Sequence, residues 1–282
     1  MTPTPARLEE PYRGRAVPPA TIRYWSWLFA AADCRDALLG IYALTAEWRA
    51  LMDPATEISA AGLKVAWWQE EMRRLAHGSP VHPISRHLAD LPRAGSVDFT
   101  PLCATIEAVA RQTAGAPLER AADLGEHSAA LYANPLLIAG RLAHGADAAA
   151  EAAVLGSLSA LAAAQYLAHA AADYRREAHR GRVIFAVDEL LAAGIDNADL
   201  GAAQPSARLQ AYLDGVRAGA AQLFAAAARE LPPAQRATMR HVLVLAALGA
   251  KHLSGRRSDA RGPRLDDLYL AWTTARRAAR PT

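Results

Sequence analysis

The chain has 282 residues, of which 52% are hydrophobic and 21% are charged. A hydrophobic fraction of this size can form a large core and argues against intrinsic disorder. The net charge of +3 is too small to indicate nucleic-acid binding, so no nucleic-acid partner is expected. Its two cysteines form neither a disulfide framework nor a CxxC metal pair, and a reducing, cytoplasmic compartment is the simplest expectation.

The N-terminal segment is rich in proline and lacks the apolar core of a signal peptide. It predicts a flexible arm over residues 1–19, followed by a single domain over residues 20–282. Abundant alanine and the scarcity of β-branched runs predict an all-α protein. Helical periodicity predicts helices over 21–33, 34–53, 56–78, 82–91, 99–114, 117–144, 147–179, 188–194, 206–230, 234–254 and 264–279, with an extended step at 181–187.

Two segments bear on membrane contact. Residues 152–172 are the most apolar stretch, but serine, glutamine and histidine interrupt it and a charged stretch follows. This pattern favours a buried central helix over a membrane span. Residues 251–264 are basic and glycine-broken, which is typical of a solvated loop and also compatible with contact to an anionic lipid surface.

A polar stripe interrupts the long apolar helix predicted over 147–179. Gln165, His169, Asp173 and Glu177 are spaced by four residues, so they share one helix face. Carboxylates at this spacing can hold Mg²⁺, which prefers to share its ligand shell with phosphates. Arginines, whose planar fork suits phosphate, lie in and just after the stripe at Arg175, Arg176, Arg180 and Arg182.

A plainer interpretation of the same residues stays open. Asp173 with Arg176, and Glu177 with Arg180, are also ordinary i,i+3 ion pairs of a solvated helix face. The end of the predicted helix over 34–53 offers a second polar set, with Arg49 between two carboxylates. That set is equally compatible with an anion site and with an ordinary amphipathic helix end.

Several motifs, in this order, resemble the squalene/phytoene synthase family. They are "CRDALLGIYAL" from residue 34, "VAWWQEEMRRLAHGSPVHPISRHLADL" from residue 65, "DYRRE" from residue 173, "RGR" from residue 180 and "VIFAVDELLAAGI" from residue 183. The resemblance covers about residues 20–255. It implies an all-α isoprenoid synthase fold, a single helical bundle around a central apolar cavity. Active members join two prenyl diphosphates head to head with Mg²⁺.

The resemblance assigns roles to positions of this chain. It implies that Asp173 and Glu177 are catalytic metal ligands and that Asp53 is a further metal ligand, with Mg²⁺ as the cofactor. An isoprenyl diphosphate, or another long apolar ligand, is the expected partner. Peripheral contact with the inner membrane is a further expectation. The expected substrate-binding residues are Arg49, Gln165, His169, Arg176, Arg180 and Arg182.

The chain departs from the family pattern at the first aspartate motif. Where active members have Asp-Asp-x-x-Asp, this chain has "RALMD", from Arg49 to Asp53, which keeps one carboxylate of three and adds a cation. The departure is similar to a divergent branch that contains respiratory complex I assembly factors. Three functions therefore stay open: an isoprenyl-diphosphate-binding protein of the prenyltransferase lineage, a non-catalytic assembly or scaffold factor, and a one-substrate prenyl diphosphatase.

Arg49 admits two hypotheses. It binds a diphosphate in place of a metal ion, or it pairs with Asp173 or Glu177 and closes the site as a salt bridge. Alanine-rich helices pack closely and leave little room for a second diphosphate, which favours the salt bridge.

Overall fold

A computed structural model describes residues 8–51, 58–254 and 265–280 of the chain. These residues form helices and short helical turns, with no strand among them. The α-helices are α1 (Glu10–Ala16), α2 (Ile22–Leu28), α3 (Arg35–Ala50), α4 (Ile58–Ala76), α5 (Pro83–Ala89), α6 (Thr100–Thr113), α7 (Leu124–Ser128), α8 (Asn134–His144), α9 (Ala148–Ala178), α10 (Val187–Ala192), α11 (Asn197–Gly201), α12 (Ala207–Glu230), α13 (Arg240–Ser254) and α14 (Leu265–Ala278). The all-α prediction is confirmed.

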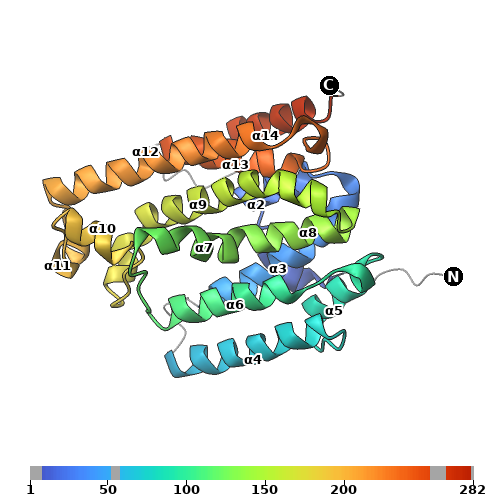
Figure 1. The fold of residues 1–282 in the computed structure, drawn as a ribbon, viewed down its shortest axis with the longest axis horizontal. Coiled ribbons are helices and arrows are strands. Elements are labelled where there is room, and N and C mark those ends of the chain that lie inside the picture. The colour runs from blue at the N-terminus through green and yellow to red at the C-terminus, as the bar shows by residue number, and fades with distance from the viewer. Residues whose placement is uncertain (1–7, 52–57, 255–264, 281–282) are drawn as a thin grey trace.

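Helix α9 crosses the middle of the bundle. It lies between α7 and α8 on one side and α12 on the other (Figure 1). Its contact with α12 is the most extensive between any two helices. The Ser157 hydroxyl donates to the Ala227 carbonyl of α12 at 2.7 Å, and both residues are fully buried. Small side chains thus let the two backbones approach closely along the helix that carries the polar stripe.

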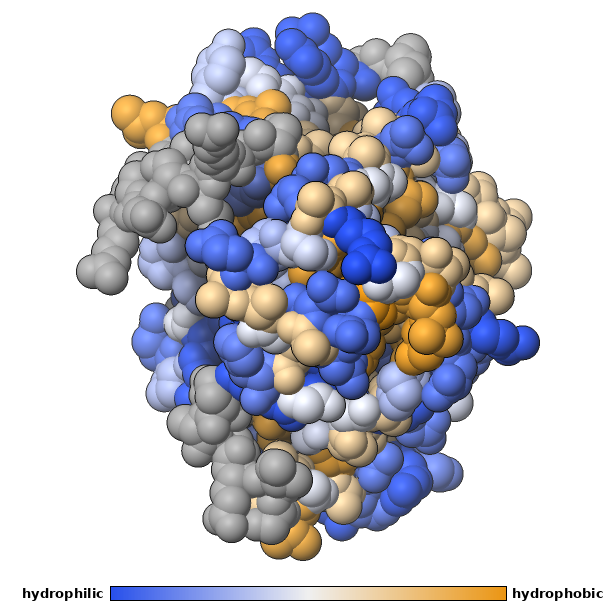
Figure 2. Space-filling model, turned by 90° about the vertical axis from the view of Figure 1, so that its left-hand side faces the viewer, coloured by the Kyte–Doolittle hydropathy of each residue, from blue (hydrophilic) through white to orange (hydrophobic). Residues whose placement is uncertain are grey.

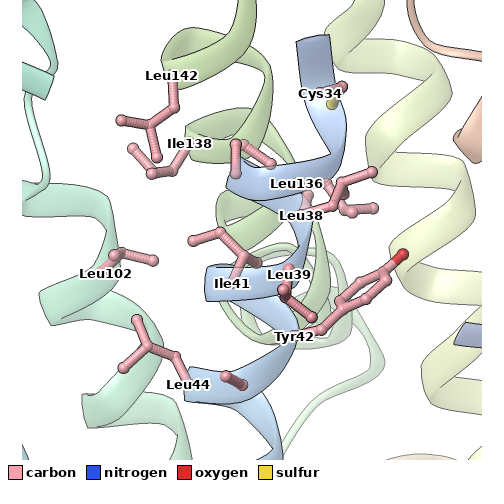
Figure 3. Close-up of a cluster of buried hydrophobic side chains, with 14 of the residues drawn as sticks. Cys34, Leu38, Leu39, Ile41, Tyr42, Leu44, Leu102, Leu136, Ile138 and Leu142 are labelled. Carbon is pink, nitrogen blue, oxygen red and sulfur yellow. The ribbon is translucent and has the colours of Figure 1, made fainter. Parts of the chain in front are cut away.

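Helix α3 forms the second axis of the core. Its apolar side chains point towards α6 and α8, where Leu38, Ile41 and Leu44 meet Leu102 and Ile138 (Figure 3). All five are almost fully buried. Because α3 ends at Ala50, this packing carries Arg49 to one end of the bundle, the same end at which α9 terminates (Figure 1).

The expected helix over 117–144 is interrupted. A π-helical segment, η4 (Ala129–Ala133), separates α7 from α8, and the chain before α7 forms a short 3-10 turn, η3 (Ala121–Asp123). A π turn disturbs the regular i→i+4 ladder of an α-helix. The buried Thr105 hydroxyl of α6 donates to the Ala130 carbonyl at 2.7 Å, which supplies that carbonyl with a partner. Helical periodicity does not reveal such an insertion, because the apolar pattern continues through it.

The expected loose arm is in part a helix. Residues 10–16 form α1, which packs against α3, and Ala16 and Val17 are buried. Arg15 of α1 forms an ion pair with Glu47 of α3 at 2.6 Å. Proline at the second helical position is compatible with a helix start, because the missing N–H is unpaired there in any case. Residues 1–7 lie outside the described part of the chain.

The extended step at 181–187 lies against the chain before α7. Ala186 forms an isolated parallel bridge with Leu118, and the Val187 N–H donates to the Leu118 carbonyl at 2.8 Å. The Tyr166 hydroxyl of α9 donates to the Ile184 carbonyl at 2.7 Å. These contacts fix the turn that follows α9.

Among the described residues, α9 is also the one helix long and apolar enough to cross a bilayer. The core helix of a soluble protein meets the same criteria of length and composition. Here α9 contributes Leu158, Leu161 and Ala164 to the core, each fully buried.

Gly40 provides a test of the packing between α3 and α5. A Cβ at this position would lie 2.5 Å from Leu88 Cδ2, and Leu88 is fully buried. We expect Gly40→Ala to lower the free energy of unfolding by about 1–3 kcal/mol, the usual cost of overpacking. Gly215→Ala in α12 is the matched control, because a Cβ there meets nothing within 4 Å. It should gain up to about 1 kcal/mol from helix propensity. Equal melting temperatures for the two variants would contradict this packing.

Candidate functional site

A cavity of about 1400 Å³, partly open to solvent, lies among the helices of the bundle. Helices α2, α3, α6, α8, α9, α12 and α13 and the segment η4 contribute to its wall. Much of the wall is apolar, and its apolar residues include Ile41, Val109, Leu131, Leu136, Phe224 and Leu245. The volume and character of this cavity suit a ligand with a long hydrocarbon chain.

Polar side chains of the wall come from several helices. Arg23 of α2, Arg49 of α3 and His169 of α9 line the cavity, and so does Gln165 one turn before His169. Figure 2 shows the surface at the end of the molecule where α9 ends and α12 begins. On this surface, hydrophilic side chains alternate with separate hydrophobic patches. The cavity therefore combines an apolar interior with cationic and amide groups.

Arg23 and Arg49 both line the cavity, and the charge of Arg49 acts on Arg23. Burial, and then the positive charge of Arg49, lowers the pKa of Arg23 to about 9, so Arg23 is still protonated at neutral pH. The Arg23 guanidinium lies over an aromatic ring, with its Cζ atom 5.6 Å from the centroid of the Tyr42 ring. Tyr42 in turn shares a 2.7 Å hydrogen bond with the buried Ser26 hydroxyl. Arg49 is exposed and Arg23 is half-buried.

His169 and Asp173 form a pair on the stripe of α9. His169 Nδ1 lies 3.1 Å from Asp173 Oδ2, and Arg176 Nη2 lies 3.1 Å from the same oxygen. Burial lowers the pKa of His169, while the charge of Asp173 opposes that shift. The Asp173 carboxylate therefore already has two basic neighbours, His169 and Arg176.

Glu177 is surrounded by arginines. Its carboxylate contacts Arg176 Nε at 3.3 Å, Arg180 Nη1 at 3.5 Å and Arg182 Nε at 2.7 Å. The residue is only 7% exposed. Because Gly181 has a positive φ of 70°, the chain turns sharply there and brings Arg180 and Arg182 back onto the end of α9. The motif "RGR" thus neutralises a buried carboxylate.

The predicted site residues therefore separate into two groups. Arg49, Gln165 and His169 line the cavity, whereas Asp173 and Glu177 are not among its lining residues in the described part of the chain. Asp53 lies outside the described residues. The favoured salt bridge is wrong for these residues, because the described ion pairs of Asp173 and Glu177 involve His169 and the arginines that follow, not Arg49.

These groups do not fit a Mg²⁺ site. Across residues 8–51, 58–254 and 265–280, no three His, Cys, Asp or Glu side chains are placed to hold a metal ion. Mg²⁺ needs oxygen ligands in near-octahedral geometry, and the oxygens of Asp173 and Glu177 already bind histidine and arginine. The predicted cofactor therefore has no support from the described side chains.

Sequence analysis missed Arg23 and Tyr42. One signal was present: Arg23 is the only charged residue between Thr21 and Ala32, in an otherwise apolar helix. A lone cation in such a segment requires a polar surface to face. No sequence pattern, however, showed that this surface is a cavity shared with Arg49.

The sequence model of the squalene/phytoene synthase family matches residues 20–265. The chain belongs to this family. No curated protein sequence gives a significant match. The match and the architecture confirm the predicted isoprenoid synthase fold.

Two solved structures share the fold at low sequence identity. One is a dehydrosqualene synthase in complex with a ligand, with a TM-score of 0.68 and 13% identity over 91% of this chain and 89% of that chain. The other is squalene synthase HpnC from Alicyclobacillus acidocaldarius, with a TM-score of 0.62 and 19% identity over 95% of this chain and 93% of that chain.

The arrangement around Glu177 predicts a structural effect. Glu177→Gln removes the charge that neutralises Arg182, and it should lower the free energy of unfolding by about 1.5–3 kcal/mol. Glu70→Gln is the matched control, because Glu70 also contacts two arginines but is 46% exposed. Glu70→Gln should lower the free energy of unfolding by less than about 1 kcal/mol. Chemical denaturation of both variants measures the difference. A stable Glu177→Gln protein that had lost Mg²⁺ binding would instead make Glu177 a metal ligand.

Proposed function

We propose that this family member binds one isoprenyl diphosphate, with the hydrocarbon chain in the cavity and the diphosphate against Arg49, Gln165 and His169. The observation that carries the proposal is a cavity of about 1400 Å³ with an apolar interior and cationic groups in its wall. Family membership supports the same class of ligand.

The physical basis is the separation of the ligand's two ends. Burying hydrocarbon contributes about 25 cal/mol per Å² of apolar surface removed from water. The diphosphate is strongly charged and requires cations and hydrogen-bond donors. Gln165 and His169 sit one helical turn apart on α9, and α3 brings Arg49 to the same cavity wall.

The proposed role is binding without head-to-head condensation. Members of the family typically depend on Mg²⁺ to bind prenyl diphosphates. In this chain Asp173 and Glu177 are engaged by cationic partners, and the first aspartate motif retains one carboxylate. We therefore assign Arg180 and Arg182 to holding Glu177 and the turn after α9. Arg176, which is half-exposed and contacts both carboxylates, extends the same network.

The same neutralised carboxylates favour a second candidate, a non-catalytic assembly or scaffold factor that retains the cavity. The two candidates differ in whether an isoprenyl ligand is bound. A one-substrate prenyl diphosphatase differs from both, because it releases inorganic diphosphate.

Filling the cavity tests the proposed ligand. Ala168 lines the cavity on α9, so Ala168→Phe should weaken farnesyl diphosphate binding at least about tenfold, or 1.4 kcal/mol. Ala152→Phe on the exposed surface of the same helix is the matched control and should bind normally. Calorimetric titration of both purified variants measures this. Farnesyl diphosphate that fails to bind the unaltered protein would refute the ligand, and release of diphosphate or a condensed hydrocarbon would refute the non-catalytic role.

Peripheral membrane contact is part of the proposal, because isoprenyl ligands partition into lipid. Helix α14 exposes Leu265, Tyr269 and Trp272 along one face, while Arg276 lies over the Trp272 ring at 5.2 Å. Aromatic and basic side chains in this arrangement suit the interface of an anionic bilayer.

A vesicle assay tests that surface. A Tyr269→Ser and Trp272→Ser double variant should lose most of its co-sedimentation with vesicles of anionic phospholipid. Leu63→Ser removes an equally exposed apolar side chain from α4 and should sediment like the unaltered protein. Equal sedimentation of all three proteins would exclude α14 as the contact surface, and sedimentation of none would exclude the membrane contact itself.

A further inference from the structure

Arg23 and Arg49 are two cations that line one cavity, and no carboxylate of the described residues, 8–51, 58–254 and 265–280, pairs with either of them. Arg23 packs over the Tyr42 ring, and the like charge of Arg49 lowers its pKa. Two cations that face the same cavity raise the electrostatic energy of the empty protein.

The carboxylates around them already have partners. Asp173 pairs with His169 and Arg176, and Asp214, which lines the cavity from α12, pairs with Arg217 at 2.8 Å. Glu47, two residues before Arg49, pairs with Arg15. The described carboxylates near the cavity are therefore committed elsewhere, and the unbalanced charge is positive.

We propose that Arg23 and Arg49 together hold the diphosphate of the isoprenyl ligand directly, so that binding does not require Mg²⁺. This inference rests on the proposed function and deepens it. It adds Arg23 as a binding residue, and it assigns the balancing of the diphosphate's negative charge to arginines. Two guanidinium groups would supply the positive charge that Mg²⁺ typically supplies in this family.

The chemistry of arginine supports this exchange. A guanidinium presents paired N–H donors that match two phosphate oxygens, and it carries its charge without recruiting an ion. Bound diphosphate would also remove the repulsion between Arg23 and Arg49. The ligand and the two arginines thus stabilise one another, whereas a Mg²⁺ ion placed beside two arginines would be repelled.

Calorimetry with and without EDTA tests the inference. Farnesyl diphosphate should bind in EDTA with a dissociation constant within about threefold of that measured with Mg²⁺. Arg23→Met and Arg49→Met should each weaken this metal-free binding about 10- to 100-fold, which corresponds to a charged hydrogen bond. Arg217→Met is the matched control, because that arginine lines the same cavity but is paired with Asp214.

Two further ligands separate the head group from the chain. Inorganic diphosphate should show the same dependence on Arg23 and Arg49, and farnesol should bind both variants like the unaltered protein. The melting temperature of ligand-free Arg23→Met should stay equal or rise, because a cation that Arg49 repels is removed. A structural role for Arg23 would lower it. Arg23→Lys keeps the charge without the planar fork, so its affinity for farnesyl diphosphate should lie between those of the unaltered protein and Arg23→Met. This variant provides the test if Arg23→Met does not fold.

The outcomes distinguish this inference from the proposed function. Binding that requires Mg²⁺ would overturn the direct arginine contact and leave the isoprenyl ligand intact. Failure of farnesyl diphosphate to bind under either condition would overturn the proposed function itself. Equal losses for Arg23→Met and Arg217→Met would show that overall positive charge, and not this pair, determines affinity.

Discussion

The close packing of α9 against α12 is the constraint on which the rest of the structure depends. Alanine and serine along α9 let α12 approach, with Ser157 hydrogen-bonded to the Ala227 carbonyl. Small residues at this contact leave the larger apolar side chains, such as Leu131 and Phe224, to line the cavity. The same helix continues into the polar stripe, so the contact also determines where His169 and Asp173 lie.

The polar stripe is not a uniform set of ligands. Its first half, Gln165 and His169, faces the cavity, whereas Asp173 and Glu177 are held by arginines. A helix rotates by 100° per residue, so residues spaced by four drift slowly around the axis. Over the three steps from Gln165 to Glu177, the stripe rotates away from the cavity wall. It ends among the arginines of the turn that follows α9. Identical spacing therefore gives two electrostatic roles.

The fold could be predicted from alanine content, helical periodicity and the order of family motifs. The helix over residues 10–16 was missed because the prolines in and around this stretch suggested an arm. The contact of Arg15 with Glu47 lies outside the reach of local patterns. Within the site, spacing correctly placed Gln165 and His169 together. It could not show that Arg182 would turn back onto Glu177, because that contact depends on the positive φ of Gly181.

The π turn η4 sets the rotation of the helical segment on one side of it relative to the segment on the other. A π turn adds one residue to an otherwise regular helix, so its removal would rotate everything on one side by about 100°. Leu131 and Tyr132, consecutive residues of this turn, both line the cavity. A single-codon deletion here would turn part of the lining away without breaking the helix. Related chains with and without that one residue would then differ in the shape of their cavities while keeping the same fold.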